Sequence, residues 1–193
     1  ENDADLFGVE VEMRQNLGSL FDQPSLDFLS VGGNFTYIDA SVRRSRQELL
    51  VATTTGSFSE DDFTEERTLF DQPDVLANFF VNFNFEEIGA DITLSANHTG
   101  ERLTASAGSS TSDIFEDAVT TVNFVYSQDI AWVEGLSVKF SAKNITDPTF
   151  SRSTKENGNS TPTFDESGNP ISERALESYT RGIDFSISAS YEF

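Results

Sequence analysis

The chain has 193 residues, enough for one ordinary domain or for part of a larger protein. Its 33 acidic and 12 basic residues give a formal charge of -21 at pH 7, which argues against binding to nucleic acid or to an anionic cytoplasmic membrane surface. The absence of cysteine excludes disulfides and thiolate metal sites, and the single histidine, His98, disfavours zinc or histidine-based acid–base chemistry.

The aromatic content indicates a folded chain, because disordered segments contain few aromatic residues and this one has 18 phenylalanines. No apolar run approaches the ~18 residues that a membrane-spanning helix needs. A soluble domain and a transmembrane β-barrel are both compatible with this composition.

Seven segments alternate apolar and polar residues with the period of two that a β-strand places on opposite faces. The last is the clearest, because every second residue from Ile183 to Phe193 is apolar. Phe80 is an exception, an apolar residue in the polar phase of its segment. We predict seven strands of about 10–15 residues, longer than the ~5–6 usual in soluble sheets. In chain order the segments are 7–13, 31–37, 77–85, 91–97, 118–126, 136–143 and 181–193.

The connections between these segments alternate between short and longer ones. Short turns are expected at 18–27, 86–89 and 129–135, long polar loops at 45–73 and 148–175, and an intermediate loop at 103–113. An up-and-down meander with its short turns at one rim gives this order, and transmembrane β-barrels have that asymmetry. Turn residues at 165–170 predict a small hairpin inside the last loop.

The two faces of the predicted strands differ in charge. In a β-sandwich the apolar faces would pack on each other, whereas in a large barrel they would meet lipid and the polar faces would line the lumen. Periodicity alone leaves both open, and strand length and loop asymmetry favour the barrel. The charges predicted to face the lumen are Glu10, Glu12, Arg14, Lys139, Lys143, Asp184 and Glu192.

Several stretches, in the same order, resemble the C-terminal third of TonB-dependent outer-membrane receptors. They are LFGVEVE at 6–12 leading into Asn16-Leu17, VGGNFTYIDA at 31–40, QPDVLAN at 72–78, HTGER at 98–102 and FSAKNITDP at 140–148. The final strand resembles the terminal signature that the barrel-assembly machinery reads in outer-membrane barrels. The residues that carry this signature are Phe193, Tyr191, Ala189, Ile187 and Phe185.

The resemblance implies an all-β, antiparallel up-and-down barrel segment in a bacterial outer membrane. Residues 1–193 would be the last seven strands of a barrel of about 22 strands, with the N-terminal plug outside this sequence. The implied partners are the remainder of the barrel, the plug, the inner-membrane TonB complex through that plug, the assembly machinery and lipid. The implied activity is uptake of a scarce solute such as a siderophore or an oligosaccharide. A seven-strand piece has two unpaired edges, so we expect a fragment or pairing with other chains.

Other residues are assigned smaller roles. The acidic segment 60–66 could hold Ca²⁺, but it lacks the EF-hand spacing, and a solvated loop is the better interpretation. Arg43, Arg44 and Arg46 could contact an anionic solute or a lipopolysaccharide phosphate, with a surface cluster as the default. The aromatic residues predicted at the membrane interfaces, with plain packing as the rival, are Tyr37, Tyr126, Trp132 and Tyr179.

No catalytic constellation is found in the sequence, so no enzyme activity, cofactor or metal is predicted. A soluble, secreted β-sandwich binding or adhesion module is the alternative from a different class. A small complete barrel is disfavoured by the odd number of strands.

Overall fold

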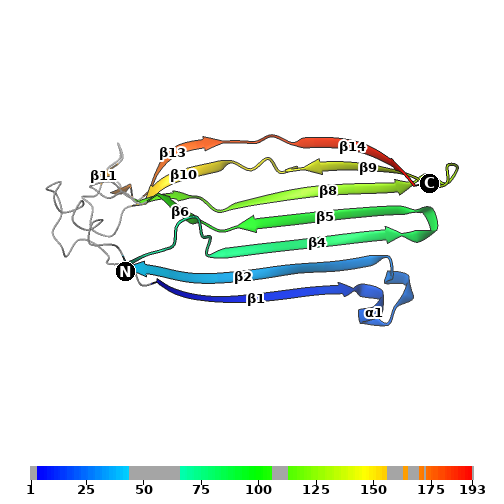
Figure 1. The fold of residues 1–193 in the computed structure, drawn as a ribbon, viewed down its shortest axis with the longest axis horizontal. Coiled ribbons are helices and arrows are strands. Elements are labelled where there is room, and N and C mark those ends of the chain that lie inside the picture. Colours follow the sequence, from blue (N-terminus) through cyan, green and yellow to red (C-terminus); the bar gives the residue numbers. More distant parts are fainter. Residues whose placement is uncertain are drawn as a thin grey trace.

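The computed structural model describes residues 4–43, 66–105, 113–155, 163–164, 170–171 and 173–192. Its main sheet is an antiparallel meander with the order β1-β2-β4-β5-β8-β9-β14 (Figure 1). The seven predicted strands and their sequential order are confirmed. The strands are β1 (Ala4–Asn16), β2 (Leu29–Arg43), β4 (Val75–Phe85), β5 (Ala90–Thr99), β8 (Val119–Asp129), β9 (Leu136–Lys143) and β14 (Asp184–Tyr191).

The three short connections lie together at one end of the sheet, on the right in Figure 1. The connection after β1, where the sequence predicts a plain turn, contains a helical turn, α1 (Leu17–Phe21), and η1 (Pro24–Leu26). Asn16 caps α1, because its side-chain oxygen accepts a hydrogen bond from the Ser19 backbone N–H at 3.0 Å. The β4–β5 connection contains η3 (Glu86–Ile88).

At the other end a second sheet continues four of the strands in the same lateral order. Its strands are β6 (Arg102–Ala105), β7 (Asp113–Glu116), β10 (Phe150–Lys155) and β13 (Glu173–Tyr179). In this order they continue β5, β8, β9 and β14 of the main sheet, respectively. A two-residue strand, β3 (Glu66–Arg67), pairs with the end of β2. The predicted small hairpin is present as β11 (Thr163–Phe164) paired with β12 (Pro170–Ile171).

The prediction of plain loops at 45–73, 103–113 and 148–175 is therefore wrong for the parts that form β3, β6, β7, β10 and β13. An alternation of apolar and polar residues identifies a strand only where one face of that strand is shielded from water. These segments extend beyond the amphipathic main sheet and pair through backbone hydrogen bonds without a regular apolar phase.

A junction separates the two sheets at one level across four strands. The breaks fall at 100–101, 117–118, 144–149 and 180–183, so the predicted last strand begins at Asp184 rather than at 181. Side chains replace part of the backbone ladder there: Asn144 Nδ2 donates to the Gly182 carbonyl, and the Gly182 N–H donates to Asp147 Oδ1, both at 2.8 Å. Next to them, Asp117 accepts hydrogen bonds from the hydroxyls of Ser151 and Ser153.

The main sheet is a single layer. Among the described residues no second sheet packs against either of its faces (Figure 1), so the two-layer sandwich is not the fold of these residues. No helix in this part of the chain has both the length and the apolar character needed to cross a membrane.

Candidate functional surface

The strand register brings the apolar positions of all seven strands onto one face of the sheet, here named the apolar face. Directly paired residues of antiparallel strands point to the same side. Val81 pairs with Val31 and Leu94, and Leu94 pairs with Phe124. A complete row therefore runs across six strands through Val31, Val81, Leu94, Phe124, Ala142 and Phe185.

The apolar face is uncovered. Phe79, Phe185 and Ile187 on this face are 53%, 67% and 76% exposed. On β5 the face extends from Ala90 to His98, roughly nine residues, close to the ~9–11 residues of a transmembrane strand.

Beyond the level of the junction, the apolar side chains of β2 change to the opposite side of the sheet. Tyr37 is the last apolar residue of the apolar phase, and Asp39 and Ser41 follow it on that side. Ala40 and Val42 alternate with them on the opposite side, and each is only 7% exposed. The apolar face therefore has a definite upper limit on this strand, next to Tyr37.

The opposite side of the main sheet, here named the polar face, is linked by hydrogen bonds between neighbouring strands. Asn78 Nδ2 donates to Asn34 Oδ1 at 2.7 Å, joining β2 and β4. Asn82 donates to Asp91 Oδ2 at 2.8 Å. The hydroxyls of two further pairs lie 2.7 Å apart, and these pairs are Ser137–Ser190 and Ser141–Ser186.

The charges predicted to face a lumen lie on this polar face or directly after it. The Arg14 guanidinium lies 5.6 Å from the centre of the Phe80 ring. Glu192 follows β14, and its backbone N–H donates to the Gly135 carbonyl at 3.0 Å. The sheet is open, so the enclosed side itself stays a prediction. Of the charges predicted to face the lumen, the register places six on the polar face: Glu10, Glu12, Arg14, Lys139, Lys143 and Asp184.

The predicted interfacial aromatic residues lie at two levels. Trp132, 84% exposed, and Tyr126, whose hydroxyl donates to Gln128 at 2.7 Å, lie at the end with the short turns. Tyr37 lies in the middle of β2, level with the start of β4, and Tyr179 stacks on Phe150 beyond the junction with ring centres 5.5 Å apart. Their contact with a membrane interface stays a prediction.

The sequence analysis missed an aromatic stack at the end with the short turns. The Phe28 ring lies 5.2 Å from Phe85 and 6.3 Å from Phe83. The apolar phase of β4 contained both partners, but Phe28 precedes its own predicted strand and gave no periodic signal. Of the predicted terminal signature, Phe185, Ile187, Ala189 and Tyr191 lie on the apolar face of β14, and Phe193 lies outside the described residues.

Most of the acidic segment 60–66 and the pair Arg44 and Arg46 also lie outside the described residues. Glu66 belongs to β3 and accepts a hydrogen bond from the Ser41 hydroxyl at 3.1 Å. Within the described part of the chain, no three His, Asp or Glu side chains are grouped as metal ligands.

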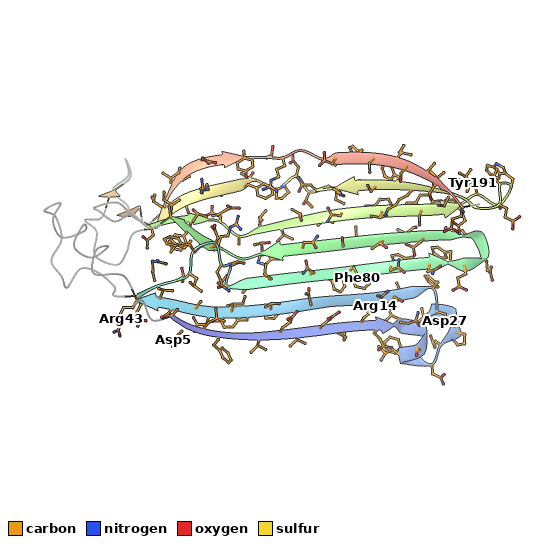
Figure 2. All side chains as sticks on the ribbon, in the orientation of Figure 1. Asp5, Arg14, Asp27, Arg43, Phe80 and Tyr191 are labelled. Atoms are coloured by element: carbon orange, nitrogen blue, oxygen red, sulfur yellow. The ribbon has the colours of Figure 1, made fainter. Side chains whose placement is uncertain are left out.

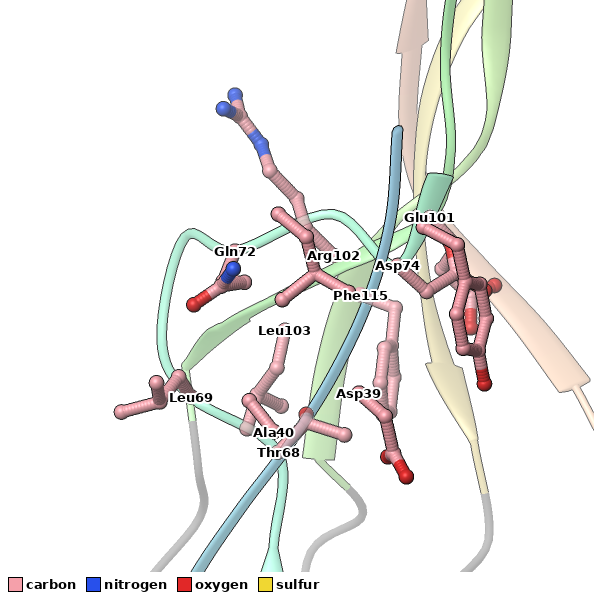
Figure 3. A pocket seen from close by; sticks show the side chains of 12 residues that line it. Asp39, Ala40, Thr68, Leu69, Gln72, Asp74, Glu101, Arg102, Leu103 and Phe115 are labelled. Atoms are coloured by element: carbon pink, nitrogen blue, oxygen red, sulfur yellow. The ribbon is translucent and has the colours of Figure 1, made fainter. Parts of the chain in front are cut away.

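A cavity of about 250 Å³ lies beyond the junction, between β2 and the β6–β7 hairpin (Figure 3). The segment 68–74 takes the lateral place of β4 there, because the Asp71 N–H donates to the Leu103 carbonyl and the Asp74 carbonyl accepts from Ile38, both at 2.8 Å. Leu69, Leu103 and Phe115 form an apolar side of the cavity. The polar residues that line it are Asp39, Thr68, Gln72, Asp74, Glu101 and Arg102.

No protein-family model matches the sequence, and no curated protein matches it. A solved structure, the ferric citrate transporter FecA in its unliganded form, superimposes with a TM-score of 0.64 over 100% of this chain, at 13% sequence identity. The chain is a segment of an antiparallel up-and-down β-barrel. It covers 25% of the FecA chain, and its own sheet is not closed.

Proposed function

We propose that this chain is a wall segment of a TonB-dependent receptor that takes up a scarce solute, such as a siderophore or an oligosaccharide, across a bacterial outer membrane. The observation that carries the proposal is the uncovered apolar face, roughly one bilayer tall. In water such a face would need a second layer to cover it. In a membrane, hydrocarbon covers it, and the paired strands satisfy the backbone polar groups.

The direction of the two edge strands supports a larger barrel. β1 and β14 both run from the loop end to the turn end (Figure 1). These edges cannot pair with each other in antiparallel fashion, so the seven strands do not close into a regular barrel on their own. A second copy in the same orientation would also place its β1 parallel to β14 of the first copy, so two copies cannot form a fully antiparallel barrel. An odd number of further strands is needed, and open edges in lipid would leave many backbone groups without partners.

Coupling to TonB and the nature of the solute come from the sequence resemblance. FecA is by its name a ferric citrate transporter, and the likeness in fold is compatible with a transport role here. The proposed partners are the rest of the barrel and its plug, the TonB complex, the assembly machinery and outer-membrane lipid. A sandwich-type binding module has no support, because no second layer covers the sheet in the part of the chain that the structure describes.

Membrane exposure can be tested by spin labelling of the full-length receptor along β5. Residues 1–193 contain no cysteine, so a single cysteine can be placed in turn at Ile92, Thr93, Leu94, Ser95 and Ala96. We expect high oxygen accessibility at Ile92, Leu94 and Ala96 and high accessibility to a water-soluble nickel reagent at Thr93 and Ser95. Equal aqueous exposure of both sets would contradict the proposal.

Transport can be tested in cells with and without the gene. Cells that carry the receptor should accumulate a solute from a panel of ferric siderophores and oligosaccharides. An uncoupler of the inner membrane should abolish accumulation while surface binding persists. Accumulation that ignores the uncoupler would contradict TonB dependence and would indicate a passive pore.

A further inference from the structure

The cavity between β2 and the β6–β7 hairpin, here named the loop-end cavity, combines aromatic rings with carboxylates (Figure 3). Tyr37 and Phe115 line it, together with Asp39, Asp74 and Glu101. Its volume is about 250 Å³, whereas a cavity of roughly 150 Å³ already accepts benzene. The loop-end cavity therefore has room for a small molecule built around one ring.

Backbone hydrogen bonds fix the walls of this cavity before any ligand arrives. The Asp71 N–H donates to the Leu103 carbonyl, and the Ile38 N–H donates to the Asp74 carbonyl, both at 2.8 Å. The Leu103 side chain is only 1% exposed. Because these walls are already ordered, a ligand would lose little free energy in arranging them.

The loop-end cavity carries negative charge that the described residues leave uncompensated. The carboxylates of Asp39 and Asp74 form no ion pair and accept no hydrogen bond within the described part of the chain. Arg102 is the basic residue among those that line the cavity, and its guanidinium is bound to Glu116 at 3.0 Å. Figure 3 shows this guanidinium directed away from Phe115.

The next cation along the chain does not line the cavity either. Arg67 precedes Thr68, which is a lining residue, but the Arg67 guanidinium lies 4.1 Å from the centre of the Phe70 ring. An anion that enters the cavity would therefore meet the carboxylates of Asp39 and Asp74 and be repelled. A cation would be attracted by both of them.

We propose that the loop-end cavity binds a small organic cation, in which an ammonium group is attached to a single ring. The carboxylates of Asp39 and Asp74 bind the ammonium group, and the Tyr37 ring adds a cation–π attraction. Leu103 and Phe115 pack against the apolar ring of the ligand. The inference goes beyond the proposed function, because the described residues supply the site whether or not the cation is transported.

Other classes of ligand use less of this cavity. Within the residues that the structure describes, no three acidic or histidine side chains are grouped as ligands of a metal ion. A bare metal ion would also leave the apolar wall without a partner. A neutral sugar would fill the space for a ring but would leave the two aspartates without a counter-charge.

Calorimetric titration of the full-length receptor in lipid nanodiscs tests the class of ligand. Benzylamine is the probe, and benzyl alcohol, benzoate and methyl glucoside are its neutral, anionic and sugar counterparts. We expect benzylamine to bind about tenfold more tightly than any of the three. Binding of any counterpart as tight as that of benzylamine, or no binding of benzylamine, would overturn the inference.

Photolabelling locates the site in the unaltered protein. Irradiation of the full-length receptor with 4-azidobenzylamine should label peptides that contain lining residues from 37–40, 68–74 or 101–103. An excess of benzylamine should prevent this labelling. Labels found only elsewhere on the receptor, or labels at these peptides that benzylamine does not reduce, would contradict the assignment.

Removal of two charges tests the role of the carboxylates. The double substitution D39N/D74N keeps the size of both side chains and should weaken benzylamine binding about tenfold. The matched control E86Q/E87Q removes two charges from η3, at the opposite end of the sheet, and should leave the affinity unchanged. Unchanged affinity in D39N/D74N, or an equal loss in both variants, would overturn the inference.

Filling the cavity provides a test that leaves the carboxylates in place. Leu69→Trp enlarges a lining residue and should abolish benzylamine binding, whereas Leu176→Trp enlarges an exposed residue of β13 and should not. Benzylamine binding that persists in Leu69→Trp would count against the site. If a variant fails to assemble, as heat-modifiable migration on gels reports, photolabelling of the unaltered receptor still decides the question. Loss of lipid exposure along β5 would contradict the transport proposal and leave this inference intact.

Discussion

The ring of Phe80, which is labelled in Figure 2, occupies the space that a side chain at Gly32 would need. The two residues are directly paired on β4 and β2, and a Cβ atom at Gly32 would lie 2.6 Å from ring atoms Cε1 and Cζ. This contact explains the apolar residue in the polar phase of β4. An aromatic ring that covers a cross-strand glycine restores the packing that the glycine lacks.

We expect Gly32→Val to lower the free energy of unfolding by about 1–3 kcal/mol, because the new side chain overlaps the Phe80 ring. In the double variant with Phe80→Ala the overlap is removed, so the combined loss should be smaller than the sum of the single losses. Urea unfolding of the full-length receptor in lipid vesicles measures all three variants. Additive losses would show that the two residues do not compete for the same space.

Arginine substitutions at neighbouring residues of β5 should have opposite outcomes. Leu94→Arg places a charge in the middle of the apolar face and should cost about 2–4 kcal/mol if that face meets hydrocarbon. Ser95→Arg, one residue further along the strand, places the charge on the polar face and should cost much less. Unfolding from vesicles gives both values, and equal losses would contradict the assignment of the faces.

Asp117, in the break between β7 and β8, is held to β10 by the hydroxyls of Ser151 and Ser153, and the Ser153 side chain is buried. Asp117→Ala removes this acceptor and should cost about 1–3 kcal/mol of local stability. Hydrogen exchange should show lost protection in β7 and β10 and unchanged protection in β4 and β5. Asp117→Asn keeps one acceptor oxygen and should lose less protection. A uniform loss across both sheets would argue against a local role.

The terminal aromatic residue is expected to act during assembly. Phe193→Ala in the full-length receptor should reduce the heat-modifiable, membrane-inserted fraction several-fold, because the proposed assembly signal loses its last apolar side chain. Ser188→Ala, in the polar phase of the same strand, is the matched control and should assemble normally. Equal assembly of both variants would leave Phe193 without the proposed role.

The period-two pattern predicted most of the main sheet because each strand there has one face of each kind. The final segment shows both the strength and the limit of that signal. Its alternation from Ile183 to Tyr191 identified the apolar face of β14 correctly. It did not show that the strand begins only at Asp184, because the preceding break depends on hydrogen bonds between Gly182 and the side chains of Asn144 and Asp147, which are distant in sequence.

The apolar phase of each strand and the order of the strands could be predicted from the amino-acid sequence, since both depend only on neighbours along the chain. The tertiary structure decided the register, which aligns residues such as Val31, Leu94 and Phe185 in one row. It also decided the pairing of segments such as β7 and β10, which have no regular apolar phase. Alternating apolar residues occur where one face of a strand is shielded from water, whereas backbone hydrogen bonds join strands regardless of side-chain polarity.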